Sequence, residues 1–140
     1  MSAEQNTRLV RDFYERFRNG EMAPLFSALA PDIEWHVPPM QSVPFSGTWR
    51  GHDGVMQFMR TLGESQDVIE FSPEEFVAQD DEVIVLGRFR MRVKSTGRVS
   101  ESAFAQVWTV DAGKITRFRE YVDTAAVSRA HSGGAAARPA

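Results

Sequence analysis

The chain contains no cysteine, which excludes disulfide frameworks, thiol nucleophiles and thiolate metal sites together. It also lacks a glycine-rich phosphate loop and a Gly-x-Ser-x-Gly nucleophile motif. The formal net charge of −3 argues against general nucleic-acid binding, which requires a basic surface. No apolar run approaches the length of a membrane span, and the first residues lack the pattern of a signal peptide. We therefore expect a cytoplasmic protein with no nucleic-acid partner and no membrane partner.

The residues that are present describe a globular domain with many aromatic side chains. The 140 residues are 42% hydrophobic and 11% aromatic, which suffices for a packed core or an apolar pocket. We assign residues 1–131 to a single domain. Residues 132–140, rich in glycine and alanine, are expected to form a flexible tail.

The first half of the chain has the periodicity of helices. Ser2 and Gln5 form a candidate capping box, and Asn19-Gly20 is a typical helix end. Residues 23–30 are predicted to form a short helix. After Gly51, the spacing of Val55, Phe58, Met59 and Leu62 predicts a third, amphipathic helix. Between these two helices, residues 33–37 alternate as in a half-buried strand, and residues 38–44 are expected to form a loop.

From residue 68 onward the hydrophobic period changes to two. This pattern predicts strands over 68–71 continuing into 76–78, then 83–94, 99–110 and 114–122, followed by a short helix that Asp123-Thr124 begins. Helices first and an antiparallel meander afterwards indicate an α+β fold, in which the helices cover one face of a curved sheet.

Alternation divides the strand over 83–94 into two faces. Its odd-numbered residues are apolar, whereas Arg88, Arg90 and Arg92 share the opposite face. A short turn at Thr96-Gly97 would place Arg92 opposite Glu101 and Phe89 opposite Phe104. The arginines fit either a solvated or dimer-contacting charged face or an anion site.

Glu120 is the candidate catalytic residue. Alternation places it between Phe118 and Val122 on the more apolar face of its strand, and a three-residue turn at 111–113 would set it opposite Phe104, near Ser102 and Gln106. Such surroundings would raise the pKa of the carboxyl group toward the range of a general acid or base. Alternatively, Glu120 pairs with an arginine at the rim, or accepts a hydrogen bond from Gln106 or a tryptophan N–H.

The three histidines do not indicate a metal site. His36 is expected to face outward from its strand, His52 lies at a helix start, and His131 lies where the expected tail begins. None has metal-ligand spacing to an acidic pair, so we predict no metal and no cofactor.

Several local motifs, in order along the chain, are similar to those of one known family. The chain resembles the SnoaL-like branch of the nuclear-transport-factor-2-like superfamily, which includes ketosteroid isomerase, limonene-1,2-epoxide hydrolase and polyketide cyclases. The motifs are Arg11-Asp12-Phe13-Tyr14 with Asn19-Gly20, Ala30-Pro31-Asp32-Ile33-Glu34-Trp35, Gly47-Thr48-Trp49-Arg50-Gly51-His52-Asp53-Gly54-Val55, Gly113-Lys114-Ile115, and Arg119-Glu120-Tyr121-Val122-Asp123.

The resemblance implies a conical α+β barrel, formed by a strongly curved, mainly antiparallel sheet with about three N-terminal helices packed on its concave face. It also implies a deep apolar pocket and a homodimer. The catalytic residues of ketosteroid isomerase are not carried over, because Val37, Phe13 and Ala105 stand at the corresponding positions.

Most of the limonene-epoxide hydrolase set is replaced as well. Its catalytic Arg and first Asp correspond to Gly87 and Phe89, and its Tyr and Asn correspond to Trp35 and Val37. Glu120 alone retains a carboxylate, at the position of the second Asp. The resemblance thus favours Glu120 as a functional residue.

The leading hypothesis is an enzyme that acts on a small hydrophobic, oxygen-bearing molecule through Glu120 as a single general acid/base. The reaction would be an isomerisation, dehydration, cyclisation or epoxide opening. The residues expected to bind the substrate are Trp35, Val37, Trp49, Phe58, Phe89, Met91, Ser102, Phe104, Gln106 and Phe118. The alternatives are a ligand-binding module with the same pocket and no catalysis, or an interaction domain that dimerises through the outer sheet face.

Overall fold

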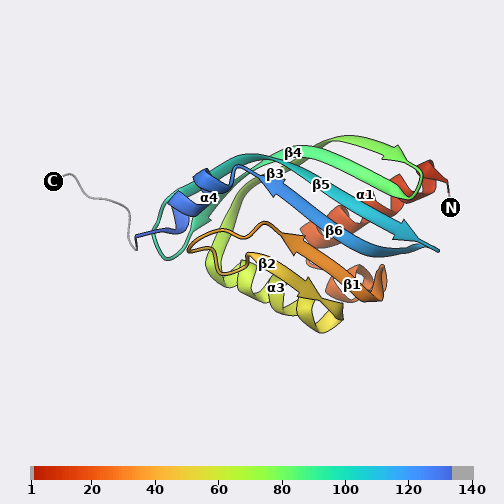
Figure 1. Ribbon diagram of the computed structural model, residues 1–140, viewed down its shortest axis with the longest axis horizontal. Coiled ribbons are helices and arrows are strands. Elements are labelled where there is room, and N and C mark those ends of the chain that lie inside the picture. The colour runs from red at the N-terminus through yellow and green to blue at the C-terminus, as the bar shows by residue number, and fades with distance from the viewer. Residues whose placement is uncertain (1, 134–140) are drawn as a thin grey trace.

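A computed structural model describes residues 2–133 of the chain as one curved sheet with four helices. Figure 1 shows α1 and α3 against the sheet and α4 at one end of the strands. Most of the expected tail, residues 134–140, lies outside the described residues. Within residues 2–133, no helix is long and apolar enough to cross a membrane.

The helices are α1 (Ala3–Asn19), α2 (Met22–Ser27), α3 (Gly51–Ser65) and α4 (Thr124–His131). The capping box predicted for α1 is confirmed, because the Ser2 side chain accepts from the Gln5 N–H and the Gln5 side chain accepts from the Ser2 N–H. Gly20 ends α1 with a φ of 72°, a left-handed conformation that glycine adopts without strain. Asp123 caps α4 as expected, since its carboxylate accepts from the Ala126 N–H.

The strands are β1 (Leu29–Val37), β2 (Gly47–Arg50), β3 (Gln66–Gln79), β4 (Glu82–Val93), β5 (Val99–Asp111) and β6 (Lys114–Val122). They form one sheet in the order β2-β1-β6-β5-β4-β3. Only the β1–β6 pair is parallel. The expected α+β fold is confirmed, with the refinement that the sheet is open, since β2 and β3 are its two edges.

The structure differs from the sequence prediction in the bounds of α2 and β1 and in the strands β2 and β3. The helix expected over residues 23–30 ends at Ser27, and β1, expected over residues 33–37, already begins at Leu29. Strand β2 was not predicted, because four residues are too few to show a period. Strand β3 is continuous across Pro73, where two strand segments with a break had been expected. Two register irregularities, at 68/70 and 73/75, interrupt its alternation and account for the apparent break.

The expected pairing registers of β4 with β5 and of β5 with β6 are wrong. Phe89 pairs with Ser102, and Glu101 pairs with Arg90 instead of Arg92. Glu120 lies opposite Gln106 instead of Phe104. The loop before β5 is longer than a tight turn, which shifts the first register. In the second, Asp111 pairs with Lys114, so the turn has two residues instead of three, and a bulge between Thr109 and Val110 adds a further shift of one residue. Both shifts are by an even number of residues, so the assignment of faces still holds.

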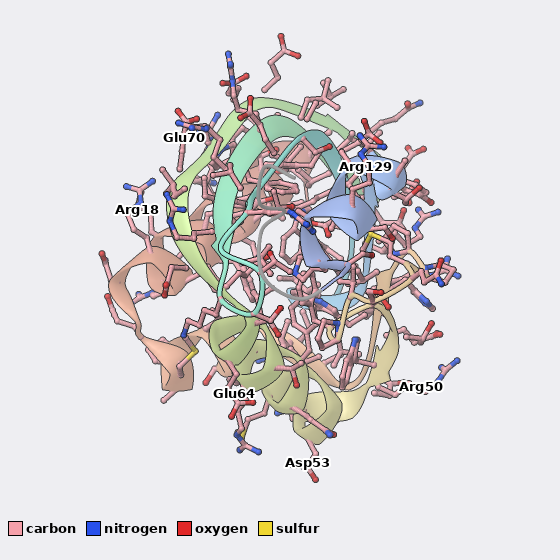
Figure 2. The ribbon with its side chains drawn as sticks, turned by 90° about the vertical axis from the view of Figure 1, so that its left-hand side faces the viewer. Arg18, Arg50, Asp53, Glu64, Glu70 and Arg129 are labelled. Carbon is pink, nitrogen blue, oxygen red and sulfur yellow. The ribbon has the colours of Figure 1, made fainter. Side chains whose placement is uncertain are left out.

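The inner face of the sheet and the helices enclose the core. Along β4 buried residues alternate with exposed ones, and Arg88, Arg90 and Arg92 are exposed on the outer face as predicted. The charged side chains that Figure 2 labels all point outward from the molecule. His36 also lies on the outer face, where its Nδ1 is 3.1 Å from the Thr48 hydroxyl oxygen.

His131, at the boundary between the expected domain and tail, is a buried residue of α4. It is the last residue of α4, is 7% exposed, and packs against the Phe45 ring at a centroid distance of 5.5 Å. Burial lowers the pKa of its imidazole. This contact joins α4 to the loop of residues 38–46, and the Ser128 hydroxyl strengthens the connection by donating to the Gln41 carbonyl oxygen at 2.9 Å.

Candidate functional site

A cavity of about 310 Å³ lies between the inner face of the sheet and the helices. Its walls are mainly aromatic and aliphatic side chains from α1, α3, β1 and β3 to β6, and the loop residues Met40 and Phe45 lie over it. Glu120 is the only charged side chain in its lining within residues 2–133. An apolar enclosure with few polar groups is typical of a site for a small organic molecule.

The Glu120 carboxylate has no cationic partner among residues 2–133. None of the ion pairs formed among residues 2–133 includes it. Its Oε2 accepts a hydrogen bond of 2.7 Å from Gln106 Nε2. Burial raises the pKa of the Glu120 carboxyl, and the hydrogen bond from Gln106 offsets only part of that effect.

A chain of hydrogen bonds holds Gln106 in place. Trp108 Nε1 donates to the Tyr14 hydroxyl oxygen at 3.0 Å, and the Tyr14 hydroxyl donates to Gln106 Oε1 at 2.5 Å. Burial raises the pKa of Tyr14 far above its ordinary value, so this phenol remains a protonated donor at neutral pH. The indole N–H can only donate and a carboxylate only accepts, which fixes the direction of the entire chain toward Glu120.

The tryptophans differ in whether their N–H groups have partners. Trp49 Nε1 donates to the Phe45 carbonyl oxygen at 3.1 Å, and Trp108 Nε1 donates to Tyr14. Trp35 Nε1 is buried and has no partner among residues 2–133. The Trp35 ring lines the cavity and stacks on Phe118 at 4.0 Å between centroids. Since Trp35 pairs with Phe118, Glu120 follows two residues further along β6 on the same face.

The structure brings together most of the residues expected at the site. Seven of them line the cavity: Trp35, Phe58, Phe89, Met91, Gln106, Phe118 and Glu120.

Four expected residues do not line the cavity. Val37 is buried in the core. Trp49 supports the loop through Phe45, whereas the Ser102 hydroxyl accepts from the Asp123 N–H, next to the start of α4. Phe104 stacks on the Phe71 ring, with 5.2 Å between the ring centroids. The altered register of β5 with β6 explains why Ser102 and Phe104 lie away from Glu120, since the expected register had placed both beside it.

Sequence reasoning missed Tyr14 and gave Trp108 no role in the site. The helical period does place Tyr14 on the buried stripe of α1. Its bond to Gln106 spans 92 positions of sequence, however, and periodicity carries no information on such a pairing.

Comparison with known proteins agrees with this architecture. Residues 10–118 match the profile of the SnoaL-like domain. The chain belongs to the SnoaL-like family. Uncharacterized protein Rv0034 of Mycobacterium tuberculosis (strain ATCC 25618 / H37Rv) is 31% identical over 127 residues, which are 90% of this chain and 95% of that protein.

Solved structures of this SnoaL-like protein's relatives have the same fold. An NTF2-like protein from Burkholderia xenovorans LB400 is 37% identical with a TM-score of 0.87, covering 94% of this chain and 99% of that one. TerC, co-crystallized with polyporic acid, is 28% identical with a TM-score of 0.78, covering 92% of this chain and 99% of that one. The chain is thus similar to NTF2-like proteins over nearly its full length.

Proposed function

We propose that this SnoaL-like protein catalyses a proton-transfer reaction on a neutral, hydrophobic, oxygen-bearing small molecule, with Glu120 as the single general acid/base. The observation that carries the proposal is the Glu120 carboxylate, which lines a mainly apolar, aromatic cavity where the described residues supply no other charge and no cationic partner. A raised carboxyl pKa brings proton uptake and release closer to neutral pH, where an acid/base catalyst is most effective.

The hydrogen-bond chain favours one carboxylate oxygen as the reacting atom. Oε2 already accepts from Gln106, whose amide is oriented by Tyr14. Oε1 has no partner among residues 2–133, so the proton of the neutral acid resides on Oε1 and faces the bound molecule. Tyr14 and Gln106 act as positioning residues, since they orient the carboxylate and leave Oε1 free.

The simplest reaction for this arrangement is proton transfer next to a carbonyl group. The ionised Oε1 takes a proton from the adjacent carbon, and the C–H electron pair moves into the enolate as charge develops on the carbonyl oxygen. The Trp35 N–H, which is buried and has no partner among residues 2–133, would donate to that oxygen after a small movement of the ring. Glu120 then returns the proton to the same carbon or to another atom of the molecule, which completes an exchange or an isomerisation.

One relative supports a small organic ligand for this fold. TerC, at 28% identity, was co-crystallized with polyporic acid. The cavity of this chain holds no arginine, lysine or histidine in its described lining, so it favours a neutral molecule over an anion.

The test is the exchange of the α-protons of 2-tetralone, a neutral apolar ketone, in D₂O at pH 7, followed by mass spectrometry. We expect the protein to accelerate exchange and Glu120→Gln to lower that acceleration by about a hundredfold or more. Glu75→Gln is the matched control, because Glu75 is exposed and outside the cavity. Equal exchange by wild type and Glu120→Gln would refute the role of Glu120.

The alternative function is binding without conversion. The buried Gln106 amide satisfies one oxygen of Glu120, as a purely structural carboxylate would require. This alternative predicts that 2-tetralone binds with no acceleration of exchange, and that Glu120→Gln leaves its affinity unchanged.

We also propose that the protein forms a homodimer through the outer face of the sheet. The face exposes Val77, Ile84, Leu86 and Tyr121 alongside its arginines. Sedimentation should give a dimer, and Leu86→Glu should shift it to monomer. A monomer in the wild type at micromolar concentration would rule this assembly out.

A further inference from the structure

Two polar side chains that the proposed chemistry does not use also line the cavity. Ser100 is 1% exposed and Gln66 is 9% exposed, yet both belong to its wall. They lie on the strands either side of β4, since Ser100 pairs with Met91 and Gln66 pairs with Val93. Both pairs place them on the inner face, near the α4 end of the sheet.

Neither side chain forms a hydrogen bond within residues 2–133. The Ser100 hydroxyl oxygen is buried and has no hydrogen-bond partner among residues 2–133. The Gln66 amide makes no side-chain hydrogen bond within the same part of the chain. An unpartnered buried polar group lowers stability, and such groups are rare without a function.

These groups are far from Glu120. Ser100 precedes Gln106, the partner of Glu120, by six residues on β5, which is about 20 Å along an extended strand and less across a curved one. The wall between the two polar regions is apolar, with Phe71, Phe89 and Met91. No charged side chain from residues 2–133 lines the cavity near Ser100 and Gln66, so this region suits a neutral group.

We infer that Ser100 and Gln66 form a second hydrogen-bonding subsite, which binds a neutral hydroxyl, carbonyl or amide at the end of the substrate remote from Glu120. The inference rests on the proposed function and narrows its substrate class. The substrate is an elongated, largely apolar molecule with an oxygen function near each end. A hydroxyl donates and accepts, and a primary amide does both, so together they match such a group in either orientation.

The test compares 4-hydroxychalcone with chalcone, which lacks only the distal hydroxyl, by measuring the dissociation constant of each. We expect wild type to bind 4-hydroxychalcone about tenfold more tightly, because the hydroxyl pairs with groups that are otherwise unsatisfied. Ser100→Ala and Gln66→Leu should each reduce this preference several-fold and leave the affinity for chalcone unchanged. Ser72→Ala is the matched control, since Ser72 pairs with Arg88 and lies outside the cavity.

The thermal stability of Ser100→Ala gives a second test. A structural role of the hydroxyl predicts a lower thermal midpoint, whereas the subsite predicts no decrease. Removing an unpartnered hydroxyl should leave the thermal midpoint of Ser100→Ala unchanged or higher. A clear fall in that midpoint would assign the hydroxyl to the fold and overturn the subsite.

The failures of the two proposals are distinguishable. Equal affinity for the two chalcones overturns the subsite alone, and so does an absence of chalcone binding while 2-tetralone exchange still depends on Glu120. If neither chalcone binds and no exchange is accelerated, the subsite and the proposed function both fall.

Discussion

The outer face of the sheet pairs its glutamates with arginines, whereas the inner face surrounds its one glutamate with aromatic side chains and an amide. Outside, Arg88, Arg90 and Arg119 contact Glu74, Glu101 and Glu82 at 3.2, 3.1 and 2.7 Å. Inside, Glu120 accepts from Gln106 and forms no ion pair with any described residue. Water already stabilises the outer carboxylates, so their partners add little. The inner carboxylate is partly shielded from water, and this burial raises its pKa and favours proton uptake.

The largest expected effect on the free energy of unfolding comes from adding a methyl group where the inner face is tightly packed. A Cβ at Gly87, on the inner face of β4, would lie 2.2 Å from the Ser72 carbonyl oxygen and 2.6 Å from Phe104 Cζ. Because backbone must move to relieve that contact, Gly87→Ala should lower the free energy of unfolding by about 3 kcal/mol or more in urea titrations.

Gly63, within α3, provides a control of opposite sign. Nothing lies within 4 Å of a Cβ there, and helical alanine is favoured over glycine. Gly63→Ala should therefore stabilise the protein by up to about 1 kcal/mol. Equal effects at the two glycines would contradict the close approach at Gly87.

Removing one tyrosine hydroxyl on each face, at Tyr14 inside and at Tyr121 outside, tests the same comparison. Tyr14→Phe removes the oxygen that joins Trp108 to Gln106 and leaves two buried groups unpaired. It should lower the free energy of unfolding by about 1–3 kcal/mol. Tyr121, which is 52% exposed, should tolerate the same change with less than about 0.5 kcal/mol.

The rate of 2-tetralone exchange shows whether Tyr14 positions Glu120 for catalysis or only stabilises the fold. With Gln106 no longer held, Tyr14→Phe should also slow Glu120-dependent exchange of 2-tetralone and leave the affinity for the ketone unchanged. An unaltered exchange rate would limit Tyr14 to a structural role.

The fold and the face that carries the site could be predicted from the sequence, but the contacts within the site could not. Alternation along a strand depends only on neighbouring residues, so Glu120, Phe118 and Gln106 could be placed on the inner face without a structure. Opposing residues depend on loop length and on the bulge beside Thr109, and an error of two residues there exchanges Phe104 for Gln106 as the partner of Glu120.

The pH dependence of stability should have opposite signs at Glu120 and Glu34. The folded-state pKa of Glu120 is raised, so the folded protein binds the proton more tightly, and stability falls as pH rises from the ordinary carboxyl pKa through the raised one. Glu120→Gln should remove that loss and be more stable than wild type at pH 7, as urea unfolding at several pH values would measure.

Glu34 has the opposite environment. The hydrogen bond and charge of Arg50, at 2.9 Å, hold the pKa of the Glu34 carboxyl below its usual range. Its contribution is present above the ordinary carboxyl pKa and is lost as pH falls through the lowered one, so Glu34→Gln should cost stability at pH 7 and none in acid. The same sign for both variants at pH 7 would mean that Glu120 has an unseen cation beside it.

The smallest expected effect lies in the outer-face pair Arg90–Glu101. Its side chains are 45% and 66% exposed, and a double-mutant cycle with Arg90→Ala and Glu101→Ala should give a coupling energy below about 1 kcal/mol that salt reduces further. The coupling should be read at several protein concentrations, because a homodimer through this face would shield the pair from water and strengthen it. A coupling that is weak in dilute protein and grows with concentration would locate the interface over these residues. A weak coupling at every concentration, in a protein that still sediments as a dimer, would place the interface elsewhere and leave the outer face solvated.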